Sequence, residues 1–482
     1  MLLATRLPHP LDRKCRWQLD CRIHWIVSVV GNSIAVSAQG PGEDNSTSVG
    51  ATSSTGYSQS SGTNTASGKT YTSTNADENA VQVTGGTFTM TSCTVNKTGG
   101  NTSNSDGSSF YGINSAVYSA GSGTIVNMTG GTITTNAIGA NSVIAYNSGT
   151  VNISDVTINN TANLSRGIHA TYKGVINAKN LTITTAGSNS SVVATDRGGG
   201  TVTVDGGTYV TTGTDCAILY STGTITASNA SGSSAKGEVG VIEGDNAIII
   251  NNCDFTAGSS ERGLMILQSG SGDSEGYNGK ITINKSKITL TDTNAPLLEV
   301  PTNIAGTLTL KDVTLTVPSG VLMKVDYNTR WTTNGGTGNL ILSTASKATY
   351  TGSVVADKYG KANVTVGGGV TWNGAMNNTN VAASSKVTVS GTWNLTADSY
   401  VDELVINTGG VVNKNGHTLT AKKTTTGNII VDGNVLQGVD RAFEGNVYTI
   451  DGRLVKSGAE NLDGLRPGIY ILNGKKYCKT AH

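Results

Sequence analysis

The chain has few charged and few aromatic residues, which make up 13% and 5% of its 482 positions. Its 33 basic and 32 acidic side chains are scattered and leave a net charge of +1. A protein that binds nucleic acid or an anionic membrane usually carries a basic patch, and this sequence has none. No apolar run reaches the roughly 18 residues that a membrane-spanning helix needs. We therefore expect neither nucleic-acid binding nor a transmembrane segment.

Cysteine is also scarce, with six residues in the chain. No two of them show C-x-x-C spacing, and no His pair lies near one, so neither zinc nor a disulfide framework is indicated. Cys93 and Cys253 each fall five residues after a strand start defined below, a position that Val156 fills elsewhere. They are predicted to be small buried apolar side chains. The sequence also lacks a phosphate loop and a nucleophile elbow, and we expect no cofactor and no metal.

What the chain has is glycine, 63 residues of it, and an apolar pattern that returns about every 25 residues. One repeat reads Val126-Asn127-Met128, followed by Thr132-Ile133. A fixed period in the twenties indicates a solenoid, whose turns each bury an apolar stripe against their neighbours. The predicted strand starts are Phe88, Val126, Val151, Ile176, Val202, Ile225, Ile248, Ile281 and Leu308.

Each period carries more than one strand. A second apolar patch, such as Val143-Ile144-Ala145, lies between the repeated pairs and is followed by a turn glycine such as Gly149. Three short strands per turn predict an all-β fold, a right-handed parallel β-helix over residues 79–425, with roughly twelve turns about 4.8 Å apart. The Leu/Asn consensus of leucine-rich repeats is absent. Residues 39–78 are expected to form a Gly/Ser/Thr-rich lead-in and cap, and the stretches near 98–109 and 269–280 to form loops.

The N-terminus has the order basic, apolar, small that marks a secretory signal peptide. The apolar part runs over residues 25–38, and cleavage is expected after Ala38. Residues 1–38 are therefore predicted to direct export, the alternative being a frayed N-terminal strand. The basic residues before the apolar part are Arg13, Lys14, Arg16 and Arg22.

Residues 426–482 differ in composition from the repeats. Two alternating strands around Asp451-Gly452 and a third that ends at Asn473-Gly474 predict a small antiparallel β-domain. The runs D-G-R-L-V, L-R-P-G-I-Y-I and N-G-K-K resemble the C-terminal sorting domain of the type IX secretion system of Bacteroidetes-type bacteria. The resemblance implies secretion machinery as a partner and an extracellular or outer-membrane-surface location in a Gram-negative bacterium. A domain that only caps the solenoid is the alternative.

The repeats themselves resemble two kinds of protein. In architecture they are similar to the pectate-lyase-like β-helix superfamily, although no G-H-G, R-I-K or N-T-D run of the polygalacturonase type and no dense acidic cluster of the calcium-dependent lyase type is present. The G-G-T turns at Gly85-Gly86, Gly130-Gly131 and Gly206-Gly207 resemble those of bacterial surface adhesins. A shared fold alone implies no activity.

Stacking the turns predicts which distant residues become neighbours. The position five residues before each strand start gives the most polar and aromatic column, made of Tyr146, Thr171, Arg197, Tyr220 and Glu243. Other polar residues lie close to it in the chain. The full set of candidate ligand-binding residues is Tyr146, Tyr172, Asp196, Arg197, Tyr220, Glu243, Asp245, Gln268 and Asp273. Arg197 suits bidentate pairing with a carboxylate or an acidic sugar, the alternative being an ion pair between turns.

These residues favour a binding protein. We expect an adhesin-like, exported β-helix that binds a polysaccharide or a surface glycoprotein. One alternative is a glycoside hydrolase that uses Asp196 with Glu243 or Asp245 as acid and base, or a polysaccharide lyase in which an arginine abstracts a proton from a uronate. Another is a structural spacer. No catalytic residue is assigned. His169 lies in an apolar patch and is predicted to be a hydrogen-bonded core or turn residue, the alternative being a base. Trp331, Trp372 and Trp393 are predicted to be partly buried or to form an end cap, the alternative being a ladder of rings that stack on sugars.

Overall fold

The computed structural model describes residues 51–269, 274–327, 336–425, 428–432, 434–439, 446–457, 459, 462–472 and 475–480. The predicted signal peptide, residues 1–38, lies outside the described residues, and so do Asp273 and Trp331.

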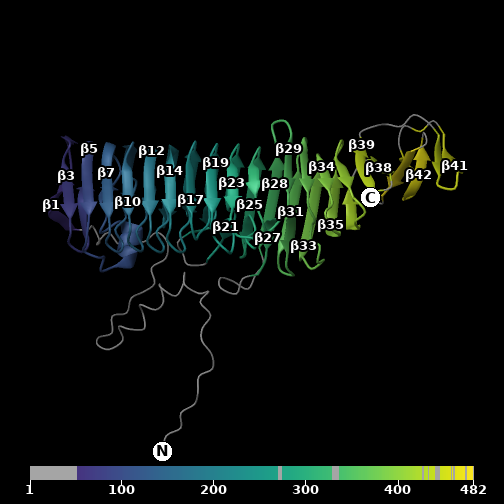
Figure 1. The fold of residues 1–482 in the computed structure, drawn as a ribbon. Coiled ribbons are helices and arrows are strands. Elements are labelled where there is room, and N and C mark those ends of the chain that lie inside the picture. The colour runs from purple at the N-terminus through teal and green to yellow at the C-terminus, as the bar shows by residue number, and fades with distance from the viewer. Residues whose placement is uncertain are drawn as a thin grey trace, which may run out of the picture. The chain divides into compact units, whose positions relative to one another are not determined.

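The chain is nearly all β, with 2% helix, and folds into a parallel β-solenoid of about 13 turns (Figure 1). The strands form three sheets, which we name A, B and C. Sheet A contains β1 (Ala51–Gln59), β4 (Glu78–Val83), β6 (Val117–Ala120), β8 (Val143–Tyr146), β11 (Ile168–Thr171), β13 (Val193–Asp196), β15 (Leu219–Ser221), β18 (Gly240–Glu243), β21 (Leu264–Leu267), β24 (Leu298–Val300), β27 (Val321–Val325) and β30 (Ser353–Ala356).

Sheet B receives up to two strands from each turn. It contains β2 (Thr63–Ser67), β3 (Thr70–Ser73), β5 (Thr87–Lys97), β7 (Ile125–Thr135), β9 (Thr150–Ser154), β10 (Thr157–Asn160), β12 (Gly174–Thr185), β14 (Gly200–Thr211), β16 (Thr224–Ser228), β17 (Ser231–Ser234), β19 (Ala247–Asn251), β20 (Asp254–Ala257), β22 (Lys280–Asn284), β23 (Lys287–Leu290), β25 (Ala305–Lys311), β26 (Thr314–Thr316), β28 (Thr337–Ser343), β31 (Lys361–Val366), β33 (Ser384–Val389), β35 (Ser399–Ile406) and β37 (Leu419–Thr425).

Sheet C combines parallel and antiparallel pairing. It contains β29 (Ala348–Thr351), β32 (Val370–Asn373), β34 (Thr392–Asn394), β36 (Val411–Asn413), β38 (Asn428–Asp432), β39 (Val435–Val439), β40 (Val447–Thr449), β41 (Leu454–Lys456), β42 (Gly468–Leu472) and β43 (Lys475–Lys479). The first four are parallel, and from β39 onward the pairings are antiparallel. The predicted small antiparallel β-domain is therefore confirmed.

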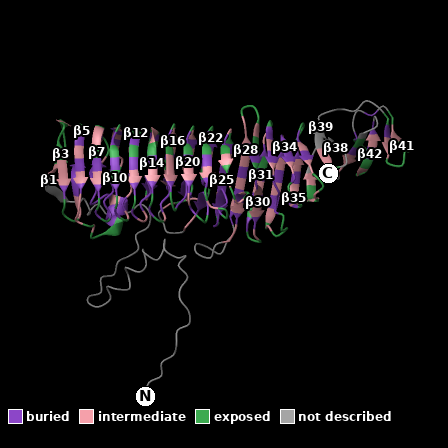
Figure 2. Ribbon diagram, in the orientation of Figure 1, coloured by how far each residue is buried: buried purple, intermediate pink, exposed green. Residues whose placement is uncertain are grey.

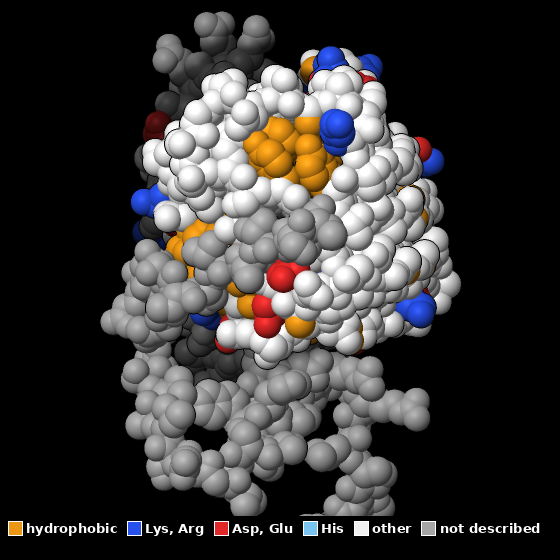
Figure 3. Space-filling model, turned by 90° about the vertical axis from the view of Figure 1, so that its left-hand side faces the viewer, with side chains coloured by type: hydrophobic (Ala, Val, Ile, Leu, Met, Phe, Trp, Pro, Cys, Tyr) orange, Lys and Arg blue, Asp and Glu red, His pale blue; other side chains and the backbone are white. Residues whose placement is uncertain are grey.

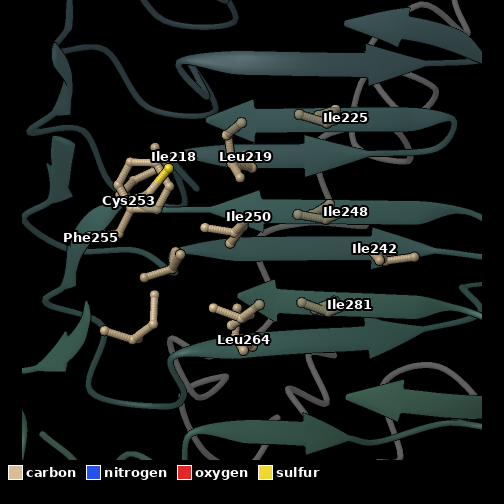
Figure 4. Close-up of a cluster of buried hydrophobic side chains, with 14 of the residues drawn as sticks. Ile218, Leu219, Ile225, Ile242, Ile248, Ile250, Cys253, Phe255, Leu264 and Ile281 are labelled. Atoms are coloured by element: carbon tan, nitrogen blue, oxygen red, sulfur yellow. The ribbon is translucent and has the colours of Figure 1, made fainter. Parts of the chain in front are cut away.

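The predicted strand starts stack in register along sheet B. Each pairs with the next, from Phe88 opposite Val126 to Ile281 opposite Leu308. Figure 4 shows Ile225, Ile248 and Ile281 at the same place on successive strands. All three are fully buried, and buried and exposed residues alternate along the strands (Figure 2). Burial of this apolar column explains why the period is visible in the sequence.

The bend between the two sheet B strands of a turn requires a left-handed backbone. Asp155, Asn180 and Asn252 adopt it with φ of 57°, 50° and 52°, a conformation that Asn and Asp tolerate better than most residues. Gly130 and Gly206 take the same place with φ of 66° and 72°, and the glycine after each, Gly131 or Gly207, is also left-handed with φ of 94° or 97°. A Cβ at Gly131 would lie 2.0 Å from the Cys93 carbonyl oxygen. The G-G-T turns are thus required by backbone conformation and close packing, whatever the protein binds.

Amide ladders join neighbouring turns. Asn177 Nδ2 donates to Asn152 Oδ1 and Asn152 Nδ2 to Asn127 Oδ1, each at 2.9 Å. Asn394 donates in the same way to Asn373 at 2.8 Å. These side-chain bonds run parallel to the backbone ladder and satisfy both ends of each amide.

Aromatic and sulfur-containing side chains fill the interior. Trp372 and Trp393 are fully buried and stack with ring centroids 5.0 Å apart, and each indole N–H donates to a glycine carbonyl. Cys93 and Cys253 are buried and unpaired, which confirms their prediction as small core residues. The tryptophans are more deeply buried than predicted, so they present no surface to a ligand.

The start of the solenoid differs from the prediction. The solenoid begins before residue 79, because β1, β2 and β3 already pair in parallel with β4 and β5. Part of the predicted lead-in is therefore a regular turn. The described surface at the β1 end is mainly uncharged, with scattered charged groups and one hydrophobic patch (Figure 3). In the described part of the chain no helix is long and apolar enough to cross a membrane.

Candidate functional site

The candidate residues lie on or beside the outer face of sheet A. Side chains alternate along each of its strands, so that Val143 and Ala145 of β8 belong to the main core whereas Ile144 and Tyr146 form a separate cluster on the other face. Strand pairing aligns the outer residues in columns. One column contains Tyr118, Ile144, His169, Ala194, Tyr220, Val241, Met265, Glu299 and Lys324.

The predicted polar column is wrong at two positions. Thr171 lies opposite Tyr146 as expected, but its partner on the next strand is Asp196 and not Arg197. Tyr220 lies opposite Ala194, in the neighbouring column. The cause is the length of the turn after sheet A. The paired residues Thr171 and Asp196 are 25 positions apart in the chain, whereas the paired glycines Gly174 and Gly200 are 26 apart. A sheet A column predicted from the strand starts of sheet B is therefore out of register by one residue at Asp196.

Asp196 is held by an arginine that the sequence did not indicate. Arg166 Nη2 lies 3.2 Å from Asp196 Oδ2, and Arg166 Nη1 donates to Ser109 Oγ at 2.8 Å. The Asp196 side chain is 4% exposed and that of Arg166 13%. Arg197 contacts Asp196 through its backbone N–H at 2.9 Å. The carboxylate is therefore committed to a largely buried ion pair between turns.

His169 lies beside this ion pair and is fully buried. Its Nε2 is 4.0 Å from Asp196 Oδ2, and in the described structure neither ring nitrogen has a hydrogen-bond partner. Burial, reinforced by the Arg166 charge, holds the pKa of His169 well below its ordinary 6.5. The residue is a core histidine as predicted, but it lacks the hydrogen bond that was expected.

The interval from Phe88 to Val126 is 13 residues longer than the 25-residue period. The inserted segment covers the Asp196 ion pair and His169. The segment ends in the short helix η1 (Gly107–Tyr111), and the Phe110 carbonyl accepts a hydrogen bond from Thr171 Oγ1 at 2.8 Å. The Arg197 guanidinium lies 3.8 Å from the Phe110 ring centroid. The stretch predicted as a loop thus leads into a segment that packs on sheet A.

The predicted tyrosines of this region form an aromatic cluster with Tyr111 of η1. Tyr111 and Tyr172 stack with centroids 5.6 Å apart, and Tyr146 meets both edge-on at 6.0 and 5.4 Å. Burial and the Tyr111 hydroxyl raise the pKa of Tyr172 above its ordinary value of 10. Tyr146 is buried, and Tyr172 is half-buried at the edge of the cluster.

A second group lies one to three turns further along the solenoid. The Tyr220 hydroxyl donates to Glu243 Oε1 at 2.9 Å, and Ser269 Oγ donates to Glu243 Oε2 at 2.8 Å. Gln268 Nε2 donates to the carbonyl of Gly276 at 2.9 Å. The Asp245 backbone N–H donates to the Glu275 carbonyl at 2.8 Å. A hydrogen bond therefore joins Tyr220 to Glu243, and bonds to residues 275 and 276 bring Asp245 and Gln268 to the same turn.

The outer column continues into a charged cluster that was not predicted. Arg262 Nε lies 2.6 Å from Glu299 Oε2, and Lys324 Nζ lies 3.4 Å from Glu299 Oε1. Burial raises the pKa of Glu299 and of nearby Glu238, although Arg262 opposes the shift in both. Glu299 pairs with Met265 across sheet A. The 25-residue period does not predict this pairing because the interval from Ile248 to Ile281 is 33 residues long.

The outer face of sheet A carries polar side chains set among aromatic rings. Within the described ranges no group of three or more His, Cys, Asp or Glu side chains is placed to hold a metal ion. The fold makes the chain a parallel β-solenoid. No family profile, curated protein or solved structure matches it.

Proposed function

We propose that this protein binds glycans through the outer flank of sheet A, as an adhesin-like surface protein. The observation that carries the proposal is the group formed by Tyr220, Glu243 and Gln268. A half-buried tyrosine ring, a carboxylate and an amide at the end of adjacent strands supply a stacking surface and hydrogen-bonding groups for sugar hydroxyls.

The surroundings of Asp196 and Glu243, two of the three carboxylates considered as acid and base, support binding over hydrolysis. Asp196 is paired with Arg166, and Glu243 accepts hydrogen bonds from Tyr220 and Ser269. A general acid must hold a proton that it can deliver to the leaving oxygen, and a carboxylate paired with arginine is poorly suited to that task. The same pairings fit a rigid surface whose polar groups are positioned before the ligand arrives.

The experiment is a glycan-array and polysaccharide-degradation screen on residues 39–482. We expect retained glycan, no product, and weaker retention by Glu243→Gln and Tyr220→Phe. Arg166→Lys is the matched control, since it changes the neighbouring ion pair and leaves the Tyr220 group intact. Binding by both Glu243→Gln and Tyr220→Phe that equals binding by the parent would contradict the proposal. Release of reducing ends or unsaturated sugars would support a glycoside hydrolase or a lyase.

We propose further that the protein is exported to the surface of a Gram-negative bacterium and that its C-terminal strands address it to a type IX secretion system. The antiparallel pairing of β40 with β41 and of β42 with β43, together with the small hydrophobic cluster in this region, supports a distinct folding unit at this end of sheet C. Deletion of residues 446–482 should trap the protein in the periplasm. Unchanged surface delivery of the truncated chain would refute the sorting role.

A further inference from the structure

Among the residues that the structure describes, the exposed aromatic rings of the solenoid are tyrosines. Trp372 and Trp393 are fully buried, whereas Tyr277 and Tyr359 are 55% and 42% exposed, the largest exposures among the described aromatic side chains. Both lie in turns that follow sheet A, the flank that also carries Tyr220 and Glu243.

Tyr359 forms a pair with Tyr327, and an aspartate holds both in place. Their ring centroids are 5.0 Å apart with the planes tilted by 49°. Asp357 Oδ2 accepts the backbone N–H of Tyr327, and Oδ1 accepts that of Tyr359, each at 2.8 Å. The Asp357 backbone N–H in turn donates to the Val325 carbonyl at 3.0 Å. The carboxylate therefore fixes two half-exposed rings from adjacent turns without burying them.

Tyr277 lies on the same flank, nearer the N-terminal end. Its carbonyl accepts the N–H of Ala305 at 2.8 Å. Ala305 is opposite Thr337, and Thr337 is opposite Lys361. Tyr277, Tyr327 and Tyr359 thus lie in this order along the axis, with one turn that has no tyrosine, the turn before Ala305, between the first two. Three strand spacings of about 4.8 Å separate Tyr277 from Tyr359 by roughly 14 Å.

The row is continuous with the candidate site. Gln268 Nε2 donates to the carbonyl of Gly276, the residue before Tyr277, at 2.9 Å. Polar groups also flank the rings, since Lys358 Nζ lies 5.0 Å from the Tyr359 ring centroid. A tyrosine ring offers an apolar face and a polar edge, which suits the C–H face and hydroxyl rim of a sugar.

We propose that Tyr277, Tyr327 and Tyr359 are stacking platforms for successive parts of one glycan, and that this glycan is a linear polysaccharide lying along the solenoid axis. The inference rests on the proposed glycan-binding function and adds the class of ligand and the direction in which it lies. A mono- or disaccharide is too short to reach from the Tyr220 group to Tyr359.

The test uses residues 39–482 and size series of two probes, a neutral β-linked glucan and a uronate polymer, as disaccharide, tetrasaccharide and octasaccharide. Calorimetry should show affinity rising about tenfold or more with length for the bound series. Tyr277→Ala and Tyr359→Ala should each weaken octasaccharide binding by about three- to tenfold, the value of one aromatic contact. Tyr359→Phe keeps the ring and should bind nearly as the parent does.

Two controls separate this inference from the function on which it rests. Tyr448→Ala, in the C-terminal sheet, should leave binding unchanged, and melting temperatures will show that each variant folds. Length-independent affinity, or normal binding by both alanine variants, would overturn the stacking row while Glu243→Gln still tests the candidate site. If the parent protein binds no probe of either series, both proposals fail.

Discussion

Arg166 and Asp196 form an ion pair of 3.2 Å between successive turns, on the outer face of sheet A and largely out of contact with solvent. Removing the arginine would leave the carboxylate buried without a counter-charge. We expect Arg166→Ala to lower the free energy of unfolding by about 3 kcal/mol. Denaturant unfolding of the purified chain measures this loss.

The matched control for that prediction is Arg197→Ala. Arg197 donates its backbone N–H to Asp196, a bond that alanine keeps, and its guanidinium lies over Phe110, so we expect a smaller loss of about 1 kcal/mol. Equal losses in the two variants would contradict the register that pairs Asp196 with Arg166.

The buried His169 should make the solenoid sensitive to acid. Its pKa is lowered in the folded chain, so the unfolded chain binds the extra proton. Stability from this group is complete above the unfolded pKa of 6.5 and falls as the pH drops below it, by up to about 1.4 kcal/mol per pH unit until the folded pKa is reached. The nearby Asp196 carboxylate favours the charged form, but burial and Arg166 outweigh it.

Thermal melting between pH 7 and pH 4, of the parent and of His169→Leu, measures this contribution. The difference between the two curves removes the effect of other groups, including Glu238 and Glu299, whose raised pKa values act in the opposite direction. A parent and a variant that lose stability in parallel would show that His169 is not responsible.

The stacked tryptophans should be essential to the C-terminal turns. Trp393→Ala would open a cavity beside Trp372 and leave the Gly374 carbonyl without its indole donor, at a cost of about 3–5 kcal/mol. Trp393→Phe should cost clearly less because most of the volume remains. A cost below about 1 kcal/mol for the alanine variant, measured by denaturant unfolding, would mean that the pair is not part of the core.

The amide ladder makes a smaller and local contribution. Asn152 both donates to Asn127 and accepts from Asn177, so Asn152→Ala should cost about 1–2 kcal/mol. Asn159→Ala, at an exposed position on β10, is the control and should change stability little. Hydrogen exchange of the neighbouring turns should accelerate only in the Asn152 variant. Equal exchange in both would argue against a stabilising ladder.

Particular residues show how far the sequence could predict the structure. The strand starts of sheet B were predictable because burial forces an apolar side chain at Ile225, Ile248 and Ile281, whatever the turns between them do. The candidate column was less secure, since one extra residue before Gly200 moves Asp196 into the place expected for Arg197.

Contacts made by long insertions could not be predicted from the 25-residue period. The pairing of Arg166 with Ser109 joins residues 57 positions apart, and it depends on how the segment before Val117 folds back on sheet A. The ion pair of Arg262 with Glu299 joins a residue inside the 33-residue interval from Ile248 to Ile281 to a residue beyond it. Both are set by tertiary packing, for which neither residue carries a local signal.

The most direct test of the central claim is a binding and turnover measurement on one sample. Residues 39–482 are incubated with the polysaccharide they retain best, and bound glycan and newly released reducing or unsaturated ends are measured together. Our account predicts saturable binding that Glu243→Gln weakens, with no released ends. Released ends that disappear in Glu243→Gln would contradict it and identify the sheet A flank as the active site of an enzyme.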